Sequence, residues 1–338
     1  MLVPAERILI VLLGAIGDVT RALPLLARLR AGYPRAHIAW AVEPAAAPIL
    51  ELHPALDERI LFERRRGLFG FAEFLRRVRK GHFDLALDLQ RHAKSGVTSF
   101  ASRAPVRIGF HRRNAKELNW VWNTRTIDPV DERGWKLEQY LRFGDVLQLD
   151  PVPVRFDITL SSAEVSRVER LLADVARPFG VLFLGSTWES RLWFPERFAA
   201  VADALDDRGL ATVLVGGDDV VDLGREIVAR ARRAPLDLCG RSSLRESYGV
   251  LARGRVAVGP DSGPMHLAAA AGTPVVSLWG ATTPARSAPW GSEDLVVVGR
   301  VACAPCYRRR CPVDRACMDD ISVPRVVAQV DRVLEERR

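Results

Sequence analysis

The stretch from Val256 to Gly280, VAVGPDSGPMHLAAAAGTPVVSLWG, decides the fold of this chain. Its first apolar residues, Val256–Val258, are typical of a buried parallel strand, and a second such strand begins at Val275. Between them lies a short Ala-rich segment in which Ser262 can cap a helix and Pro264 suits its first turn. Two short buried strands joined by a helix form a parallel βαβ unit, so the stretch predicts an α/β protein.

The turn inside this stretch also has the composition of an anion site. Gly259 and Gly263 leave its backbone uncovered, and a helix N-terminus with bare N–H groups and partial positive charge suits a phosphate. Asp261 and His266 can hold a sugar hydroxyl or a phosphate oxygen beside it. An ordinary βαβ crossover with a capped helix explains the same residues, so the stretch alone leaves both interpretations open.

The same alternation of buried strand and glycine turn occurs near the start of the chain. Ile8–Leu13 is a continuous apolar run, followed by the loop GAIGD over Gly14–Asp18. Such a loop lies at the carboxyl end of its strand, where open α/β sheets bind ligands, although the three-glycine dinucleotide fingerprint is missing. Thr20 is a candidate cap of the next helix, with Pro24 near its first turn. Further strands are predicted over His37–Val42, Asp84–Leu89, 107–109, Gly180–Leu184 and Ala211–Val215.

A proline-flanked segment at Asp150–Pro153 marks a domain boundary. The helix that follows has Ser161 or Ser162 as its cap, and beyond it the alternation of strands and helices restarts. We therefore predict two Rossmann-like, doubly wound α/β domains facing a central cleft, over residues 1–160 and 161–322. The amphipathic segment 323–338 is expected to form a final helix that packs back toward the first domain.

Composition bounds the chemistry of the partners. The 338 residues carry a formal net charge of +8, with 48% hydrophobic and 27% charged residues. This balance is typical of a globular chain with acidic partners (phosphorylated substrates, anionic lipid or nucleic acid) or of an arginine-rich solvated surface. Nucleic acid is disfavoured because zinc-finger, helix-turn-helix and RNA-binding aromatic motifs are missing. The cations gather in two stretches: Arg64, Arg65, Arg66, Arg76, Arg77, Arg79 and Lys80, then Arg107, His111, Arg112, Arg113 and Lys116.

No apolar run of the sequence approaches the ~20 residues that a membrane span needs. The run Ile8–Leu13 is too short, is soon followed by Asp18 and lacks a small-residue cleavage site, so we do not interpret it as a signal peptide. A cytoplasmic location is the resulting expectation.

Four cysteines lie close together near the C-terminus. Cys303, Cys306, Cys311 and Cys317 have the spacing C-x2-C-x4-C-x5-C. Four thiolates can close a tetrahedral structural zinc site, and C-x2-C is a usual half-site, but a second C-x2-C is missing. Reduced packed thiols and a redox or iron–sulfur role are the alternatives, whereas Cys239 is expected to be a lone core thiol.

Four motifs follow one another along nearly the whole chain: LLGAIGDVTRALPLLARLR, GSTWESRLWFPERFAAVADAL, GPDSGPMHLAAAAGTPVVSLWGATTP and the tail CAPCYRRRCPVDRACM. Together they resemble glycosyltransferase family 9, the ADP-heptose:lipopolysaccharide heptosyltransferases of Gram-negative bacteria, and the tail is similar to the heptosyltransferase II-like branch. The resemblance implies a GT-B fold with the acceptor domain first and the nucleotide-sugar domain second. It also implies inverting transfer without a metal or another cofactor.

The resemblance assigns the acceptor-side residues and the cation for the leaving group. Asp18 matches the proposed general base, which takes the proton of the acceptor hydroxyl. A carboxylate serves if the site raises its pKa, and an Asp that only stabilises a helix dipole is the alternative. Gly14 and Gly17 lie on the same acceptor-side loop. Arg191 stands where the family usually has lysine, and its charge would neutralise the departing diphosphate.

The resemblance also implies a donor site. Ser186 and Thr187 can donate hydroxyl hydrogen bonds to phosphate, or merely cap their loop. Asp218 or Asp219 follows a strand end and can meet the ribose, although Asp is also common in turns. The donor-site signature of the family, with its backbone N–H groups facing the diphosphate, is matched by Asp261, Ser262, Gly263 and His266.

The implied reaction moves a heptose from ADP-L-glycero-D-manno-heptose to the inner core of nascent lipopolysaccharide, Kdo-lipid A. The implied location is the cytoplasm, with peripheral contact at the inner face of the inner membrane. The alternatives are a family member that uses another nucleotide sugar for a surface polysaccharide, a GT-B-like epimerase, and a non-catalytic binder of anionic glycan or nucleic acid. The last is disfavoured because the glycine loops and Asp18 would then have no task.

Overall fold

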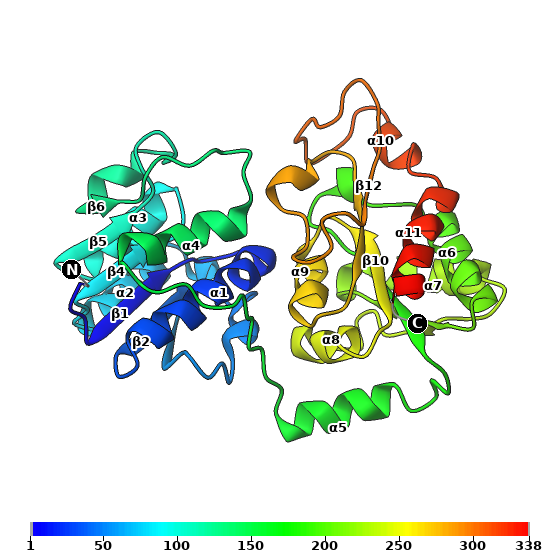
Figure 1. Cartoon of the computed structure of the whole chain (residues 1–338), viewed down its shortest axis with the longest axis horizontal. Coiled ribbons are helices and arrows are strands. Elements are labelled where there is room, and N and C mark those ends of the chain that lie inside the picture. The colour runs from blue at the N-terminus through cyan, green and yellow to red at the C-terminus, as the bar shows by residue number, and fades with distance from the viewer. Residues whose placement is uncertain (1–2, 337–338) are drawn as a thin grey trace. The chain divides into compact units, whose positions relative to one another are not determined.

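The chain folds into two α/β units, seen here in a computed structural model that describes residues 3–336 (Figure 1). The units divide between Thr159 and Leu160. The sequence prediction placed this boundary one residue later, after residue 160. Within the described residues each unit contains one six-stranded parallel sheet. The prediction of two doubly wound α/β domains is therefore confirmed.

The sheet of the first unit has the strand order β3-β2-β1-β4-β5-β6. From β1 the chain builds outward through β2 and β3, then returns to place β4 on the other side of β1. The order thus reverses between β1 and β4, which makes the loops after these two strands the expected ligand site of an open sheet. The strands are β1 Arg7–Val11, β2 His37–Val42, β3 Glu58–Leu61, β4 Leu85–Asp88, β5 Val106–Gly109 and β6 Arg125–Thr126.

The helices of the first unit pack in pairs, α1 beside α4 and α2 beside α3. Helix α1 begins at Ile16, so the prediction that Thr20 caps it was wrong. The Thr20 hydroxyl instead donates to the Ile16 carbonyl one turn back, and Pro24 lies inside the helix. The elements are α1 Ile16–Gly32, α2 Gly67–Lys80, α3 Ala93–Ala101 and α4 Lys136–Val146, with 3-10 turns η1 Ala47–Leu50, η2 Arg64–Arg66 and η3 Asn119–Trp122.

The sheet of the second unit repeats this plan with the order β12-β11-β10-β7-β8-β9, so its order reverses between β7 and β10. The strands are β7 Phe179–Phe183, β8 Ala211–Val215, β9 Leu236–Asp237, β10 Val256–Pro260, β11 Val275–Trp279 and β12 Val296–Val298. The helices are α5 Ser162–Leu171, α6 Pro195–Asp207, α7 Val221–Arg230, α8 Leu244–Leu251, α9 Gly263–Ala270, α10 Ala316–Asp319 and α11 Val323–Glu336, with 3-10 turns η4 Glu189–Arg191, η5 Asp218–Val220 and η6 Pro284–Arg286.

The C-terminal helix α11 belongs to the second unit. Its buried face, Val326, Val330 and Val333, joins the core formed by Leu182, Val258 and their neighbours. The helix contacts α6 and the strands β10 to β12. The expectation that it packs back toward the first domain is corrected accordingly, because its apolar stripe is already covered within its own unit.

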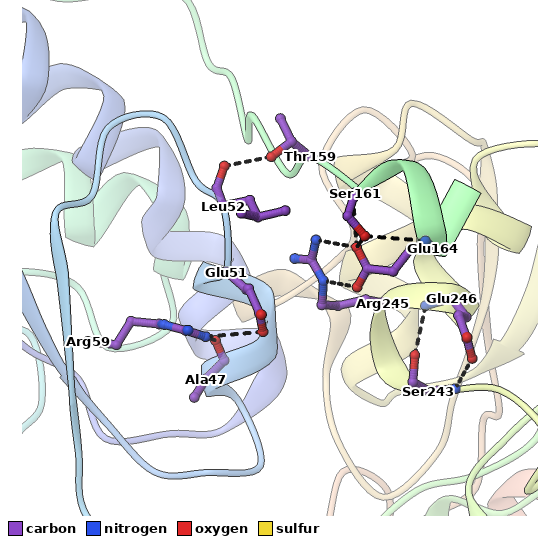
Figure 2. A network of polar contacts seen from close by, with 10 residues as sticks. All are labelled: Ala47, Glu51, Leu52, Arg59, Thr159, Ser161, Glu164, Ser243, Arg245 and Glu246. Carbon is purple, nitrogen blue, oxygen red and sulfur yellow. Dashed lines mark hydrogen bonds and ion pairs between the residues drawn. The ribbon is translucent and has the colours of Figure 1, made fainter. Parts of the chain in front are cut away.

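Each end of the connection between the units is fixed to its own unit (Figure 2). The Thr159 hydroxyl donates to the Leu52 carbonyl at 2.6 Å. Ser161 caps α5, as predicted, in a capping box with Glu164, and the buried Arg245 of α8 donates to both carboxylate oxygens of Glu164. The hydrogen bonds from Arg245 lower the pKa of Glu164 to about 2. Helix α5 is therefore held on α8 by a charged pair in addition to apolar packing.

Among the described residues, the structure contains no helix that is both long and apolar enough to cross a membrane.

Candidate active site

The glycine loop of the first unit is fixed from the neighbouring strand. Gln90, just past the end of β4, donates through Nε2 to the Gly14 carbonyl at 3.3 Å and accepts the Leu13 N–H at Oε1, also at 3.3 Å. Gly17 is buried in the first turn of α1. Loop residues 13–17 thus have a defined path at the point where the strand order reverses.

Asp18 lies in the first turn of α1 and is surrounded by donors. Its Oδ1 accepts from Arg21 Nη2 at 2.6 Å, from the Lys136 ammonium, and from the Tyr140 hydroxyl at 3.4 Å. Arg21 comes from the next turn of α1, while Lys136 and Tyr140 come from the start of α4. Helix α4 packs against α1, so a residue 118 positions away along the chain reaches the same carboxylate oxygen as Arg21.

The charge of Asp18 is strongly stabilised. Burial would raise its pKa, but the charges and hydrogen bonds of Lys136 and Arg21 outweigh burial and hold the pKa of this carboxyl well below its ordinary value. The condition for a catalytic Asp18, that the site raises its pKa, is therefore not met while both cations contact it. The carboxylate is ionised and ready to accept a proton, but it is a weak base while both cations contact it.

A second acid, Asp88, supports this half of the site. It ends β4, is fully buried, and accepts from Asn119 Nδ2 at 2.7 Å and from the Gln90 N–H at 3.0 Å. Burial raises the pKa of Asp88 to about 7, although hydrogen bonds from Asn119 and Ser95 oppose the rise. Asp88 thus holds Gln90 in place, and Gln90 in turn holds the glycine loop.

The second unit brings together around Asp261 the loops that follow β7, β10 and β11. Arg191 Nη1 lies 3.1 Å from Asp261 Oδ2 and donates to the Asp261 carbonyl at 3.3 Å. The Ser186 hydroxyl donates to the same carbonyl at 3.1 Å, and the Thr282 hydroxyl donates to Oδ2 at 2.7 Å. The Arg191 guanidinium also lies 4.0 Å from the centre of the Trp188 ring. The loops after β7 and β10, on either side of the point where this sheet's order reverses, are thus tied into one cluster.

The start of α9 has the features of an anion site. Ser262 is the residue before the helix, but its side chain makes no capping hydrogen bond, and its buried Oγ has no hydrogen-bond partner among residues 3–336. The predicted cap is therefore wrong, and the hydroxyl does not occupy the first-turn amides that begin at Gly263. Because these amides carry the positive end of the helix dipole beside Arg191, this corner is electropositive. His266 is buried one turn into the helix.

The remaining donor-site candidates lie at the same sheet edge. Thr187 shares the loop of Ser186, and Asp218 opens η5 after β8, but in the described part of the chain neither has a hydrogen bond to the Arg191–Asp261 cluster. Gly259 has a packing role: a Cβ at this position would lie 2.3 Å from the Phe183 carbonyl oxygen. The close approach of strands β7 and β10, rather than an open backbone, explains that glycine.

The cysteines of the tail differ in environment. Cys303 is exposed and Cys317 is buried, and all are free thiols. Burial raises the pKa of Cys317. Within residues 3–336, no group of three or more His, Cys, Asp or Glu side chains is arranged to hold a metal ion, so structural zinc stays a prediction of the spacing.

Comparison with known proteins now adds a family to this geometry. The sequence profile of glycosyltransferase family 9 (heptosyltransferase) matches residues 71–316. The chain belongs to this family. The lipopolysaccharide heptosyltransferase 1 of Pseudomonas aeruginosa is 28% identical over 318 residues, with 90% of this chain and 87% of that protein covered. The lipopolysaccharide core heptosyltransferase OpsX of Haemophilus influenzae is 23% identical over 295 residues, covering 86% and 84%.

Solved structures give the same fold to this family 9 enzyme. A family 9 glycosyl transferase from Veillonella parvula superposes with a TM-score of 0.86 at 22% identity, with 98% of both chains covered. The ADP-heptose lipopolysaccharide heptosyltransferase II of Escherichia coli superposes with a TM-score of 0.77 at 23% identity, covering 98% of this chain and all of that one. These likenesses confirm the expected fold class.

The sequence alone did not single out the residues that contact or support Asp18. Lys136, Tyr140 and Gln90 lie far from it along the chain and carry no motif. Arg21 had a local signal, because a residue three positions after Asp18 on a helix shares its face. Asp88 had a weaker one, since a carboxylate that ends an apolar strand lies at the ligand-binding edge of a parallel sheet.

Proposed function

We propose that this family 9 enzyme transfers a heptose from ADP-L-glycero-D-manno-heptose to the lipopolysaccharide inner core, Kdo-lipid A, in the cytoplasm. The names of the relatives support the sugar and the acceptor. One observation carries the mechanism: each half of the chain has an acid–cation cluster at the carboxyl edge of its sheet, Asp18 in the first unit and Arg191–Asp261 in the second.

In the first unit Asp18 is the general base. The acceptor hydroxyl oxygen attacks the anomeric carbon from the face opposite the diphosphate, its proton passes to Asp18, and the bond between the anomeric carbon and the phosphate oxygen breaks. Asp18 can accept that proton only when the hold of Lys136 and Arg21 weakens. The anionic groups of the acceptor supply the means, since carboxylates and phosphates compete with Asp18 for the same two cations.

In the second unit the Arg191 corner receives the donor diphosphate. The backbone N–H groups of Ser262 and Gly263 at the start of α9 and the Arg191 guanidinium balance the charge that builds up on ADP as it leaves. Hydroxyls of Ser186 and Thr187, together with His266, complete the phosphate contacts. Asp218 is assigned to the ribose. Because protein groups supply the positive charge, we expect transfer without a metal.

The acceptor lies in a membrane, so we also propose peripheral contact with the inner face of the inner membrane. The cationic stretches of the first unit, 64–80 and 107–116, have the charge that anionic lipids attract.

The experiment that tests the donor is calorimetric titration of the purified protein with ADP-heptose, ADP, UDP and GDP in turn. Selective binding of ADP-heptose and ADP supports the proposal, and preference for UDP or GDP would overturn the heptose assignment while keeping the family. A following assay with radiolabelled sugar and a Kdo-bearing acceptor then separates transfer from epimerisation, which needs no acceptor.

A further inference from the structure

Helix α2 has an apolar face buried in the core of the first unit. Phe74 and Val78 are buried, and Phe71 packs partly against the same cluster. The Phe62 ring, just after β3, lies 5.0 Å from the Phe74 ring and 5.6 Å from the Phe71 ring. These contacts fix the helix firmly, so its other face has a defined orientation away from the core.

That outer face carries two large apolar side chains at its N-terminal end. Phe69 is 90% exposed and Leu68 is 85% exposed, the highest values for large apolar side chains among the described residues. Single exposed apolar residues are common, but two adjacent ones on a helix that is packed on the core form a small protruding apolar patch. We call Arg64, Arg65, Leu68 and Phe69 the α2 tip.

The α2 tip is surrounded by positive charge. Residues 63–80 contain seven cations and two carboxylates, a net charge of +5. Both carboxylates are engaged by Arg66, and Glu73 also by Arg77. Arg64 and Arg65 are exposed and have no salt bridge among residues 3–336. Their charge therefore faces solvent directly beside Leu68 and Phe69.

The α2 tip and the glycine loop before Asp18 both follow the carboxyl ends of strands in the first unit's sheet. Strands β3, β2 and β1 are parallel neighbours, so their carboxyl ends share one edge. The chain leaves β3 at Leu61 and reaches Arg64 three residues later, and it leaves β1 at Val11 and enters the glycine loop at Gly14. A surface that contacts the α2 tip would therefore face the same edge of the first unit's sheet as the glycine loop does.

We propose that the α2 tip docks this enzyme on an anionic membrane surface, with Leu68 and Phe69 inserted at headgroup level and Arg64 and Arg65 on lipid phosphates. An apolar pair flanked by arginines matches the interface of a bilayer, where apolar insertion and attraction to anionic lipid add together. A stable protein interface needs about 800 Å² on each partner, far more than two side chains provide. The choice of a membrane as the occupant rests on the proposed function, because the proposed acceptor is anchored in one.

Sedimentation with lipid vesicles tests this proposal without any substrate. Wild-type protein is expected to bind vesicles of phosphatidylethanolamine and phosphatidylglycerol and to bind pure phosphatidylcholine much more weakly. The double variant Leu68→Ser/Phe69→Ser should lose about 10–100-fold in partition coefficient, since each inserted side chain contributes about three- to tenfold when it is partly buried. The double variant Arg64→Gln/Arg65→Gln should lose about 25-fold on anionic vesicles and nothing on neutral ones, at about fivefold per charge.

A matched control is Val313→Ser, which removes an apolar side chain that is 55% exposed in the second unit; it should bind like wild type. All variants should keep the wild-type unfolding midpoint because the altered side chains are exposed. Equal binding of Leu68→Ser/Phe69→Ser and wild type, or absence of binding to anionic vesicles, would overturn the proposal.

Transfer to a lipid-free acceptor separates the docking from the chemistry. Leu68→Ser/Phe69→Ser should retain wild-type turnover on a soluble Kdo oligosaccharide and lose activity only when the acceptor is embedded in vesicles. If wild type binds vesicles but transfers no heptose to either acceptor, the proposed function fails and the docking surface stands. If it transfers heptose but the tip variant is equally active on embedded acceptor, the docking surface fails and the function stands.

Discussion

Replacing Lys136 by Gln should change the pH dependence of catalysis through Asp18. Two cations, Lys136 and Arg21, contact Asp18 Oδ1, and each cation beside a carboxyl lowers its pKa by about 1–3. Removing Lys136 leaves burial, which raises the pKa, opposed by Arg21 and by the longer contact from Tyr140. The pKa of Asp18 should therefore rise toward or above its ordinary range.

The sign of the effect on rate follows from the role of the base. Asp18 must be ionised to accept the acceptor proton, so activity falls as pH drops through its pKa. In wild type this pKa lies well below the ordinary range, and the acidic limb of kcat/KM should not reflect Asp18 above about pH 4. In Lys136→Gln an acidic limb set by Asp18 should instead appear above about pH 4, because the pKa of Asp18 rises. At pH 8 the acceptor KM should rise about tenfold, as one charge-assisted contact to the acceptor is lost.

The assay is initial-rate transfer from ADP-heptose between pH 4.5 and 9, with the acceptor varied at each pH. Lys136→Arg keeps the charge and should retain the wild-type limb. On a soluble acceptor Lys80→Gln, which removes an exposed lysine of α2, should change nothing. Asp18→Asn should lose at least ~10²-fold in kcat at every pH with ADP affinity kept. An acidic limb in Lys136→Gln that coincides with wild type would refute the role of Lys136 in setting the basicity of Asp18.

Three further predictions concern the second unit. Arg191→Ala should weaken ADP binding about 10–100-fold, and Arg191→Lys should weaken it less, as calorimetry can measure. An Arg191→Ala variant that binds ADP as tightly as wild type would remove Arg191 from the phosphate site. Since the pKa of Glu164 falls from 4.5 to about 2 on folding, its pair with Arg245 stabilises the protein above pH 4.5 and this contribution is lost between pH 4.5 and 2. Arg245→Met should lower the free energy of unfolding by about 1–2 kcal/mol at pH 7, because the hydrogen bonds from Ser161 to Glu164 remain, and denaturant titrations should show the gap closing as pH falls through that window. Exposed Cys303 should react with iodoacetamide well before buried Cys317, as peptide mass spectrometry can follow; equal rates in the folded protein would contradict the burial of Cys317.

Strands were the easiest part of the fold to predict from the sequence. His37–Val42 and Ala211–Val215 are apolar runs bounded by turn residues, and both match β2 and β8 residue for residue. The short edge strands β6 and β9, of two residues each, lack such a run, because an edge strand is apolar on fewer positions. Periodicity could not reveal them.

The direction in which α11 packs was mispredicted for a different reason. Its amphipathic pattern establishes that one face is buried, but the pattern does not say which core covers that face. The caps show the same limit. Ser161 and Ser262 both precede a helix, yet only Ser161 bonds the first turn, because a reciprocal Glu164 is present three residues later.

The candidate site could be predicted only as far as it is local. Asp18, Ser186, Arg191 and Asp261 stand on loops that follow apolar strands, so their position at a binding edge follows from strand and turn signals. The Asp18–Lys136 pair depends on the packing of α4 against α1, which no spacing in the sequence encodes. That contact, together with Arg21, holds the pKa of Asp18 well below its ordinary value despite burial.

The two candidate clusters, around Asp18 in the first unit and around Arg191 and Asp261 in the second, are built in the same way. In each unit the order of strands reverses at one pair, β1 and β4 or β7 and β10, and there the two neighbouring loops diverge and leave room for a ligand. Each unit then ties its two loops together with a polar side chain, Gln90 to Gly14 in the first and Ser186 to Asp261 in the second. What differs is the placement of charge. In the first unit two cations contact Asp18, and in the proposed mechanism proton removal waits for an anionic acceptor that engages those cations. In the second, a guanidinium and helix amides face a single carboxylate and leave positive charge for a diphosphate. In the same proposed mechanism, a base restrained until the acceptor arrives would also limit activation of water, which would otherwise hydrolyse the donor.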